Sequence, residues 1–307
     1  MKKYRVASRP SLLAFSQTEQ TVRLLQERFP QYAFEIIKFT THGDRQTDTP
    51  LTSFGGTGVF VKELETALLE GKADFAIHSL KDVPSIQPEG LTLASFPKRE
   101  DPRDVILMRD DSISDFRQLD EHCIIGTGSP RRILQLKQQK KEALYADLRG
   151  NIDTRLRKLN EGQYDAIVVA AAGLKRIGKV IPENGYLPVE VCIPAIGQGA
   201  LAIECRKDDR ETYDILRAIN DAETETSVIA ERSFMLTVGG GCKFPLAAYA
   251  TIEGSNIRLR TMTGDHITGK IVYYTGLAPV TEAEHLGIAS AHAVMKLAKE
   301  QGIILQN

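Results

Sequence analysis

The sequence predicts an α/β protein built from more than one domain. Short apolar strands alternate with amphipathic helices through residues 4–170, the pattern of a mostly parallel sheet covered by helices. The chain has 307 residues, too many for one ordinary hydrophobic core. A charged segment with two prolines, residues 97–104, indicates a crossover from a first domain to a second.

The first α/β unit is expected to end near residue 96. Its helix at 12–25 spaces Leu12, Leu13, Phe15, Val22, Leu24 and Leu25 for one buried face. Residues 40–57 are polar and broken by Gly and Pro, which predicts a long loop of the functional or mobile kind. The remaining expected elements are strands at 4–7, 34–39, 75–77 and 91–96 and a helix at 59–69.

A second unit and a smaller last unit follow. The second has expected strands at 105–108, 124–125 and 166–170 and helices at 131–140 and 152–160. The chain turns back near residues 193–199 into a strand at 200–204, so two crossovers, one out and one back, suit two domains joined by a hinge. The last unit is α+β, with helices at 227–236 and 282–301 and strands at 247–252, 257–261 and 270–274.

Composition narrows the range of partners and compartments. The formal net charge is -1, so no global field would recruit nucleic acid or an acidic membrane, and we expect neither as a partner. No apolar run has the length of a signal peptide or a membrane span. The cysteines Cys123, Cys192, Cys205 and Cys242 lack metal-ligand spacing, which argues against zinc and disulfides. We expect a cytoplasmic protein without a metal.

Cys242 stands apart from the other cysteines because of its neighbours. It follows Gly239, Gly240 and Gly241, and three successive glycines indicate a backbone that approaches another group closely or turns at positive φ. The ordinary interpretation is a buried or idle thiol in a tight turn. Three distant segments, residues 9–11, 78–84 and 126–132, favour another: a basic, anion-binding cleft around a group attached to Cys242.

Candidate anion ligands follow the predicted strands, where open α/β sheets bind their ligands. Residues 126–132 follow a strand and open a helix with Pro130 first, so free N–H groups, Ser129 and the forks of Arg131 and Arg132 can meet an anion. Arg149 and Arg155 are further inward-facing candidates. This basic excess indicates a polyanion without choosing phosphate or carboxylate. Neither glycine-rich turn matches a nucleotide-binding motif.

Asp82 and His78 each have two interpretations. Beside Lys81, a buried Asp82 could stay charged and stabilise a cation or shuttle a proton, or it could merely cap the turn before Pro84. His78 could be a satisfied histidine at a strand end or the partner of Cys242 in a Cys/His pair, and nothing in the spacing decides.

Taken together, these motifs identify a family. The chain resembles porphobilinogen deaminase, also called hydroxymethylbilane synthase, over nearly its whole length. The segments that carry the resemblance are Arg9-x-Ser11 and residues 43–44, 60–65, 78–84, 99–104, 126–132, 148–156, 172–176, 194–200 and 240–242.

The resemblance implies two periplasmic-binding-protein-like lobes joined by a hinge, plus a smaller α+β C-terminal domain. The implied domains are 1–98 with 200–218, 99–199, and 219–307. It also implies a dipyrromethane cofactor in thioether linkage to Cys242. On this primer four porphobilinogen molecules would join head to tail, each losing ammonia, before water releases hydroxymethylbilane. The implied enzyme belongs to tetrapyrrole biosynthesis and acts as a monomer.

The resemblance also assigns roles to single residues. Asp82 would stabilise positive charge on pyrrole nitrogen. The residues that would hold cofactor carboxylates are Lys81, Thr127, Ser129, Arg131, Arg132, Arg149 and Arg155. Those expected nearer the incoming substrate are Arg9, Ser11 and Arg176.

The chain departs from the family pattern in a lid segment. The lysines usual in this lid are Ser53 and Thr57 here, His42 replaces an arginine, Gly128 and Pro130 replace Ser and Leu, and residues 243–244 read Lys-Phe. Weaker substrate capture or a paralogue of reduced activity is therefore an alternative. Two others are a non-catalytic organic-anion-binding protein with the same cleft and a hydrolase with a cysteine nucleophile.

Overall fold

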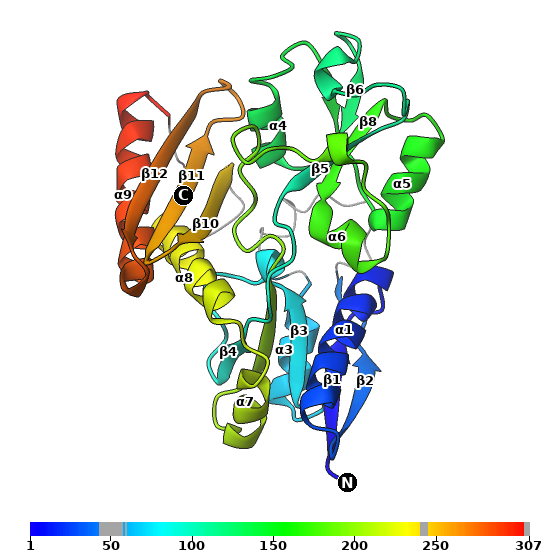
Figure 1. The fold of residues 1–307 in the computed structure, drawn as a ribbon, viewed down its shortest axis with the longest axis vertical. Helices are drawn as coiled ribbons and strands as arrows, with labels where there is room; N and C mark the ends of the chain where they lie inside the picture. Colours follow the sequence, from blue (N-terminus) through cyan, green and yellow to red (C-terminus); the bar gives the residue numbers. More distant parts are fainter. Residues whose placement is uncertain (43–57, 59, 240–244, 304–307) are drawn as a thin grey trace.

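The computed structural model has three regions, each built around its own sheet (Figure 1). It describes residues 1–42, 58, 60–239 and 245–303. We call lobe 1 the region around the five-stranded sheet, lobe 2 that around the four-stranded sheet, and the C-terminal domain that around the three-stranded sheet. In Figure 1 lobe 1 lies at the bottom, lobe 2 at the top and the C-terminal domain at the left.

Lobe 1 has the strand order β2-β1-β3-β9-β4. Its strands are β1 (Lys3–Ser8), β2 (Ala33–Lys38), β3 (Phe75–Ser79), β4 (Leu91–Ser95) and β9 (Leu201–Arg206). Its helices are α1 (Leu12–Arg28), α3 (Lys62–Leu69) and α7 (Arg210–Arg217). Strands β1, β2 and β3 are parallel, whereas β9 runs antiparallel to both β3 and β4. The sheet is therefore mixed, because β9 enters it from the second lobe rather than through a helix of lobe 1.

Lobe 2 has the strand order β5-β8-β6-β7. Its strands are β5 (Asp104–Met108), β6 (Ile124–Gly126), β7 (Leu144–Ala146) and β8 (Ala166–Ala170). Its helices are α4 (Pro130–Leu136), α5 (Ile152–Asn160) and α6 (Ala171–Arg176). The strand that arrives through the crossover, β5, is again antiparallel to its neighbour. Each lobe thus holds one antiparallel strand among strands that run in a common direction, so the expectation of mostly parallel sheets is confirmed.

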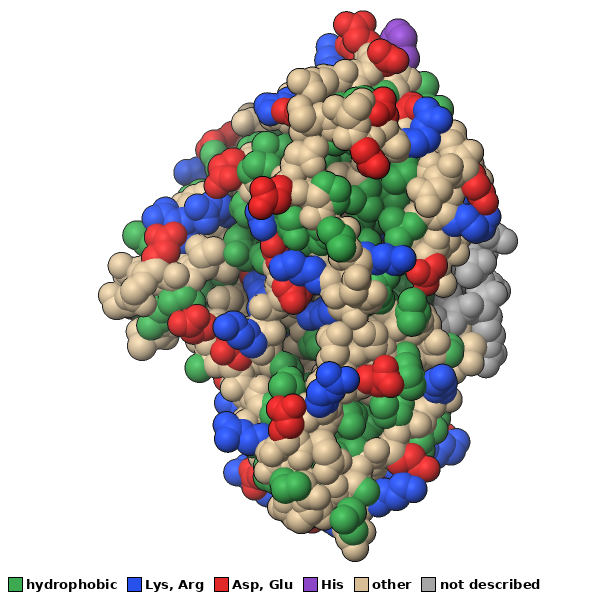
Figure 2. Space-filling view, turned by 45° about the vertical axis from the view of Figure 1, so that its right-hand side comes forward, with side chains coloured by type: hydrophobic (Ala, Val, Ile, Leu, Met, Phe, Trp, Pro, Cys, Tyr) green, Lys and Arg blue, Asp and Glu red, His purple; other side chains and the backbone are tan. Residues whose placement is uncertain are grey.

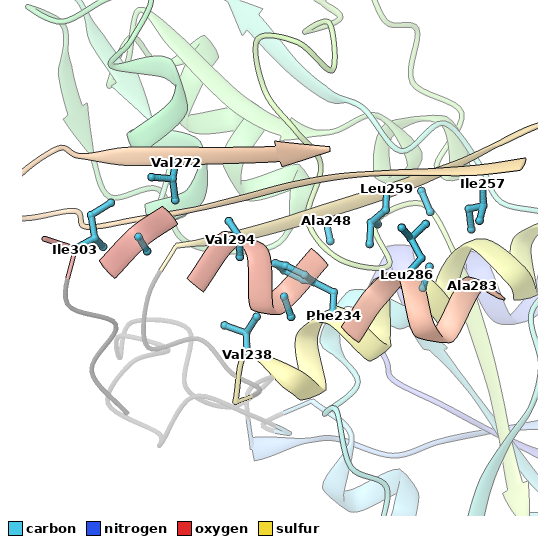
Figure 3. Packing of buried hydrophobic residues seen from close by; sticks show 14 residues of the cluster. Phe234, Val238, Ala248, Ile257, Leu259, Val272, Ala283, Leu286, Val294 and Ile303 are labelled. Carbon is cyan, nitrogen blue, oxygen red and sulfur yellow. The ribbon is translucent and has the colours of Figure 1, made fainter. Parts of the chain in front are cut away.

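The C-terminal domain packs two helices against an antiparallel sheet. Its elements are α8 (Ala222–Thr237), β10 (Leu246–Glu253), β11 (Asn256–Gly264), β12 (Ile271–Pro279) and α9 (Ala283–Glu300). Phe234 of α8, Val294 of α9 and Leu259 of β11 are buried in its core (Figure 3). The predicted two α/β lobes and smaller α+β domain are confirmed.

Three features position the lobes against one another. A cluster around Leu134 and Met262 joins lobe 2 to the C-terminal sheet, and a cluster with Val228 of α8 joins lobe 1 to the same domain. Helix α1 of lobe 1 touches α6 of lobe 2, where the Ser16 hydroxyl donates to the carbonyl of Arg176 at 2.6 Å. Figure 2 shows basic and acidic side chains interspersed over one face.

The buried face of α1 differs from the prediction. Leu12 and Leu24 are 54% and 44% exposed, whereas Gln17 and Thr18 are buried. The two polar residues bond to lobe 1: the Gln17 amide donates to the Ser79 hydroxyl at 3.0 Å, and the Thr18 hydroxyl donates to that of Ser8 at 2.8 Å. Hydrogen bonds at the strand ends therefore orient this helix against its apolar periodicity.

Candidate active site

The turn that carries Lys81 and Asp82 follows β3 directly. Residues Leu80–Asp82 form one 3-10 turn, held by bonds from the Leu80 N–H to the Ala200 carbonyl and from the Val83 N–H to the Leu80 carbonyl, each 3.0 Å. Leu80 and Val83 are buried, while Lys81 is exposed and Asp82 partly exposed. The buried neighbours thus fix the turn and leave its two charged side chains open to a ligand.

The turn before α4 places Arg131 and Arg132 in the interior of lobe 2. Ser129 caps the helix and Pro130 is its first residue, as predicted. The side chain of Ser129 accepts from the Arg132 N–H at 3.5 Å, and Thr127, 1% exposed, accepts from the Ser129 N–H at 3.3 Å. Both hydroxyl groups therefore stabilise the turn, and each can still donate to an anion.

Asp104, at the start of β5, is the carboxylate that orients the two arginines. Its Oδ2 lies 2.7 Å from an Arg131 nitrogen, and its Oδ1 accepts from Arg132 at 2.7 and 3.0 Å and from the Gln198 amide at 2.9 Å. Burial alone would raise the pKa of Asp104, but Arg131 and Arg132 hold it below its usual range. Sequence reasoning missed this residue, although it lies in one of the quoted motifs.

Lys81 and Asp82 face this arginine pair across the junction of the lobes. The surrounding protein lowers the pKa of Lys81 to about 8, with Arg132 and Arg131 contributing, although the side chain stays accessible to solvent. Burial likewise lowers the pKa of Arg155 to about 10, and its nearby charges include Arg132 and Asp82. We call the residues Lys81, Asp82, Asp104, Arg131, Arg132 and Arg155 the junction cluster.

The junction cluster has a surplus of positive charge. Four of its six side chains are cationic and two are carboxylates, and one of these carboxylates, Asp104, is already saturated by hydrogen bonds. Arg149, bonded to Asp147, adds a further cation beside Arg155. Positive groups held close together, two of them buried, are costly unless an anion joins them. The arrangement therefore suits a ligand with several negative charges.

The predicted substrate-side residues lie just before α1, at its cap and at the end of α6. Arg9 stacks on the ring of Phe60, with 4.2 Å from its guanidinium carbon to the ring centre. Ser11 caps α1 by accepting from the Ala14 N–H at 3.4 Å. Arg176 donates to the Gly199 carbonyl at 2.7 Å, and burial lowers its pKa to about 10. Arg9, Ser11 and Arg176 therefore each have a structural partner in addition to any ligand.

His78 belongs to the interior of lobe 1. Its Nε2 lies 3.0 Å from Glu204 Oε2, with both side chains nearly inaccessible. This pairing favours the interpretation of a satisfied strand histidine over that of a base for Cys242.

Several predicted features lie outside the described residues: Cys242 with Gly240 and Gly241, the lid positions Ser53 and Thr57, residues 43–44, and the Lys243-Phe244 departure. The other three cysteines are buried thiols. Among the described residues, no group of three or more His, Cys, Asp or Glu has a metal-binding arrangement. No helix in that part of the chain is both long and apolar enough to cross a bilayer.

Two solved structures match the chain weakly. The VFT2 domain of BvgS from Bordetella pertussis matches with a TM-score of 0.42 and 18% identity, covering 76% of this chain and 91% of that domain. The BenM effector-binding domain with benzoate matches with a TM-score of 0.41 and 16% identity over 71% of this chain and 91% of that one. These scores are too low to indicate a shared function.

Family models and curated relatives match the chain far more closely. Residues 4–214 match "Porphobilinogen deaminase, dipyromethane cofactor binding domain", and residues 226–296 match "Porphobilinogen deaminase, C-terminal domain". A porphobilinogen deaminase from Brevibacillus brevis is 45% identical over 96% of this chain and 94% of its own length. One from Bacillus cereus is 43% identical over 100% of this chain and 99% of its own. The chain belongs to the porphobilinogen deaminase family.

Proposed function

We propose that the junction cluster is the active site of a porphobilinogen deaminase in which Asp82 is the catalytic carboxylate. The family assigns the overall reaction to this chain: porphobilinogen is deaminated and polymerised with a dipyrromethane cofactor, in tetrapyrrole biosynthesis. The observation that carries the assignment of residues is the surplus of cations around one partly exposed carboxylate. Each pyrrole carries an acetate and a propionate, so cofactor and substrates are polycarboxylates.

The residues present fit the cofactor. Arg131 and Arg132 keep their positive charge with one shared carboxylate partner, so a cofactor carboxylate would complete the charge balance. Lys81, Arg149 and Arg155, with the hydroxyl groups of Thr127 and Ser129, would hold the remaining carboxylates. When bound to Cys242, the cofactor supplies the pyrrole to which the first substrate is joined.

The fixed turn that carries Asp82 supports a role for this carboxylate in the chemistry of porphobilinogen. When the substrate loses ammonia and its ring is attacked, positive charge develops on pyrrole nitrogen. A carboxylate already held in place stabilises that charge without reorganising at the moment of reaction. The 3-10 turn supplies this fixed placement, and Arg155 lies near enough to interact with Asp82. Arg9, Ser11 and Arg176 would bind the incoming substrate.

The substitution Asp82→Asn tests the assignment of the catalytic residue. The amide keeps the size of the side chain but removes its charge, so the protein should keep covalently bound pyrroles and lose most of its turnover. The expected loss is about 100-fold or more, the scale of a lost charge-stabilising group. Asp153→Asn, which removes an exposed carboxylate in the first turn of α5, serves as the control. Near-normal turnover in Asp82→Asn would exclude the assigned role.

A non-catalytic anion-binding protein and a cysteine-nucleophile hydrolase make different predictions. The binding protein would carry no attached pyrroles, and the hydrolase would have a Cys242 thiol open to small thiol reagents. The proposed enzyme has a blocked Cys242 and produces hydroxymethylbilane. Its expected monomeric state is checked by size-exclusion chromatography with light scattering, and its expected cytoplasmic location by cell fractionation.

A further inference from the structure

Arg232 on α8 holds the segment that follows Asp82. One guanidinium nitrogen, Nη2, donates to the Pro84 carbonyl at 2.8 Å and to the Ser85 carbonyl at 3.2 Å, and Nη1 lies 3.5 Å from the Val83 carbonyl. A single planar fork from the C-terminal domain thus reaches three successive carbonyls of lobe 1. Such a fork is rigid, so its contacts restrict where the backbone can lie.

The surroundings of Arg232 disfavour its positive charge. Burial lowers its pKa to about 10, and Glu204 is the nearby charge that opposes this shift. Within the described ranges no carboxylate lies at ion-pair distance from Arg232, in contrast to Arg217 and Arg99 on the same domain boundary. A half-buried charge that contacts only neutral carbonyls has a free-energy cost of desolvation, so it adds little to the stability of the domain contact. This cost points to a role beyond stability.

A second contact from the same helix supports the same segment. Val228, one helical turn before Arg232, is fully buried in a cluster with Leu80 and Val83, the residues that flank Lys81 and Asp82. An apolar and a polar contact of α8 therefore act on the two sides of one turn. The turn is attached to lobe 1 by β3, but its far side is attached to α8.

We propose that Arg232 is a positioning residue that fixes the backbone after Asp82 and thereby the direction of the Asp82 carboxylate. This inference rests on the proposed function, since it acts through Asp82. Arg232 touches no reacting atom. Without its hydrogen bonds, residues 83–85 lose their polar contact with α8, and the carboxylate samples directions in which it stabilises charge less well. A displacement of about 1 Å in an active site can cost as much as about 100-fold in rate.

The test compares two arginine substitutions in the cofactor-loaded protein. Arg232→Met keeps the apolar stem but removes every donor. Arg206→Met is the control: Arg206 is also partly buried and also donates to backbone carbonyls, those of Leu68 and Ala73 at 2.9 and 2.8 Å, but it lies at the end of β9 far from the turn. Unlike Arg232, it also pairs with a carboxylate, that of Asp209 at 2.8 Å. Both proteins should keep their covalently bound pyrroles. Arg232→Met should lose about tenfold or more in kcat with little change in KM. In Arg206→Met both kcat and KM should stay close to those of the wild type.

Two further variants separate positioning from general destabilisation. Arg232→Lys can still reach one carbonyl, so its kcat should lie between those of the wild type and Arg232→Met, and it replaces Arg232→Met if that protein does not fold. In a double-mutant cycle with Asp82→Glu, the loss from Arg232→Met should shrink, because the carboxylate on which it acts is already displaced. If the losses in kcat from Arg232→Met and Asp82→Glu simply multiply in the double mutant, the inference is wrong. Equal kcat in Arg232→Met and Arg206→Met would also overturn it. Unchanged turnover in Asp82→Asn would instead overturn the proposed function itself.

Discussion

Lys81 shows at the residue scale how the junction cluster prepares for its ligand. Protein around its ammonium group and the neighbouring Arg131 and Arg132 lower the pKa of Lys81 to about 8, while Asp82 and Asp104 act in the opposite direction. The site therefore holds its cations together before any anion arrives. The binding of carboxylates relieves that repulsion, so part of the affinity is already built into the cofactor-free protein.

A pH dependence follows from this lowered pKa. Below about 8 Lys81 is charged, and above it the charge is lost. Cofactor-free protein should therefore load its cofactor more slowly as the pH rises through about 8. In Lys81→Arg the guanidinium stays charged throughout, so loading should continue to higher pH. Intact mass spectrometry during loading measures the rate, and an identical alkaline decline in both proteins would contradict the assignment.

At the scale of elements, periodicity predicted most helices and strands but not those whose sequences are polar or very short. The predicted helix at 152–160 and the predicted strand at 166–170 match α5 and β8. In contrast, α8 begins at Ala222 rather than at the predicted residue 227. The first turn of α8 is Ala-Glu-Thr-Glu-Thr, which offers no apolar pattern, and its start depends on Asp221 accepting from the Thr224 N–H at 2.8 Å. Elements β7, α6 and α7 escaped prediction; β7 has three residues and α6 six.

The contact between α8 and α9 requires a glycine. A Cβ on Gly287 would lie 2.3 Å from the Ala230 carbonyl oxygen and 2.9 Å from the Phe234 nitrogen, both backbone atoms of α8. Gly287→Ala should therefore lower the free energy of unfolding by about 1–3 kcal/mol, despite the higher helix propensity of alanine. Ala289→Leu, on the exposed side of α9, is the control for added volume. Equal stability of the two variants in denaturant titrations would show that the helices can separate without cost.

At the scale of the whole molecule, Glu231 connects the hinge to the C-terminal domain. This fully buried carboxylate binds Arg99 of the outgoing crossover at 2.6 and 3.1 Å, the Gly197 N–H of the returning crossover at 2.7 Å, and the Ala250 N–H of β10 at 2.9 Å. All three regions therefore meet at one side chain. The outgoing crossover was predicted from its charge and prolines and the returning one from the turn near residues 193–199. This carboxylate was not predicted, because its partners are 132, 34 and 19 residues away.

Removing the charge of Glu231 should destabilise the molecule. Glu231→Gln leaves Arg99 without its counter-charge in a buried place and presents an amide to backbone donors, so we expect a loss of about 3–5 kcal/mol. Glu225→Gln provides a control on the same helix, since Glu225 also pairs with an arginine through two bonds but is more exposed. Its loss should be below about 1 kcal/mol. Equal losses in the two variants would exclude the proposed effect of burial.

The junction cluster itself was only partly predictable. The rule that ligands bind beyond strand ends selected Lys81, Asp82, Arg131 and Arg132, and the structure places them on opposite sides of the lobe junction. The rule about strand ends could not show that Asp104 orients both arginines or that Arg232 holds the Asp82 turn. Such pairings depend on the three-dimensional arrangement of the lobes, which no local pattern encodes.

The mass of the intact purified protein tests the central claim most directly. If the junction cluster binds a cofactor attached to Cys242, the mass of the protein should exceed that of the polypeptide by two pyrrole units. Peptide mapping should place this excess mass on Cys242. The excess should vanish in Cys242→Ser. A wild-type protein with the bare chain mass and no hydroxymethylbilane synthesis, or an excess retained in Cys242→Ser, would contradict the account.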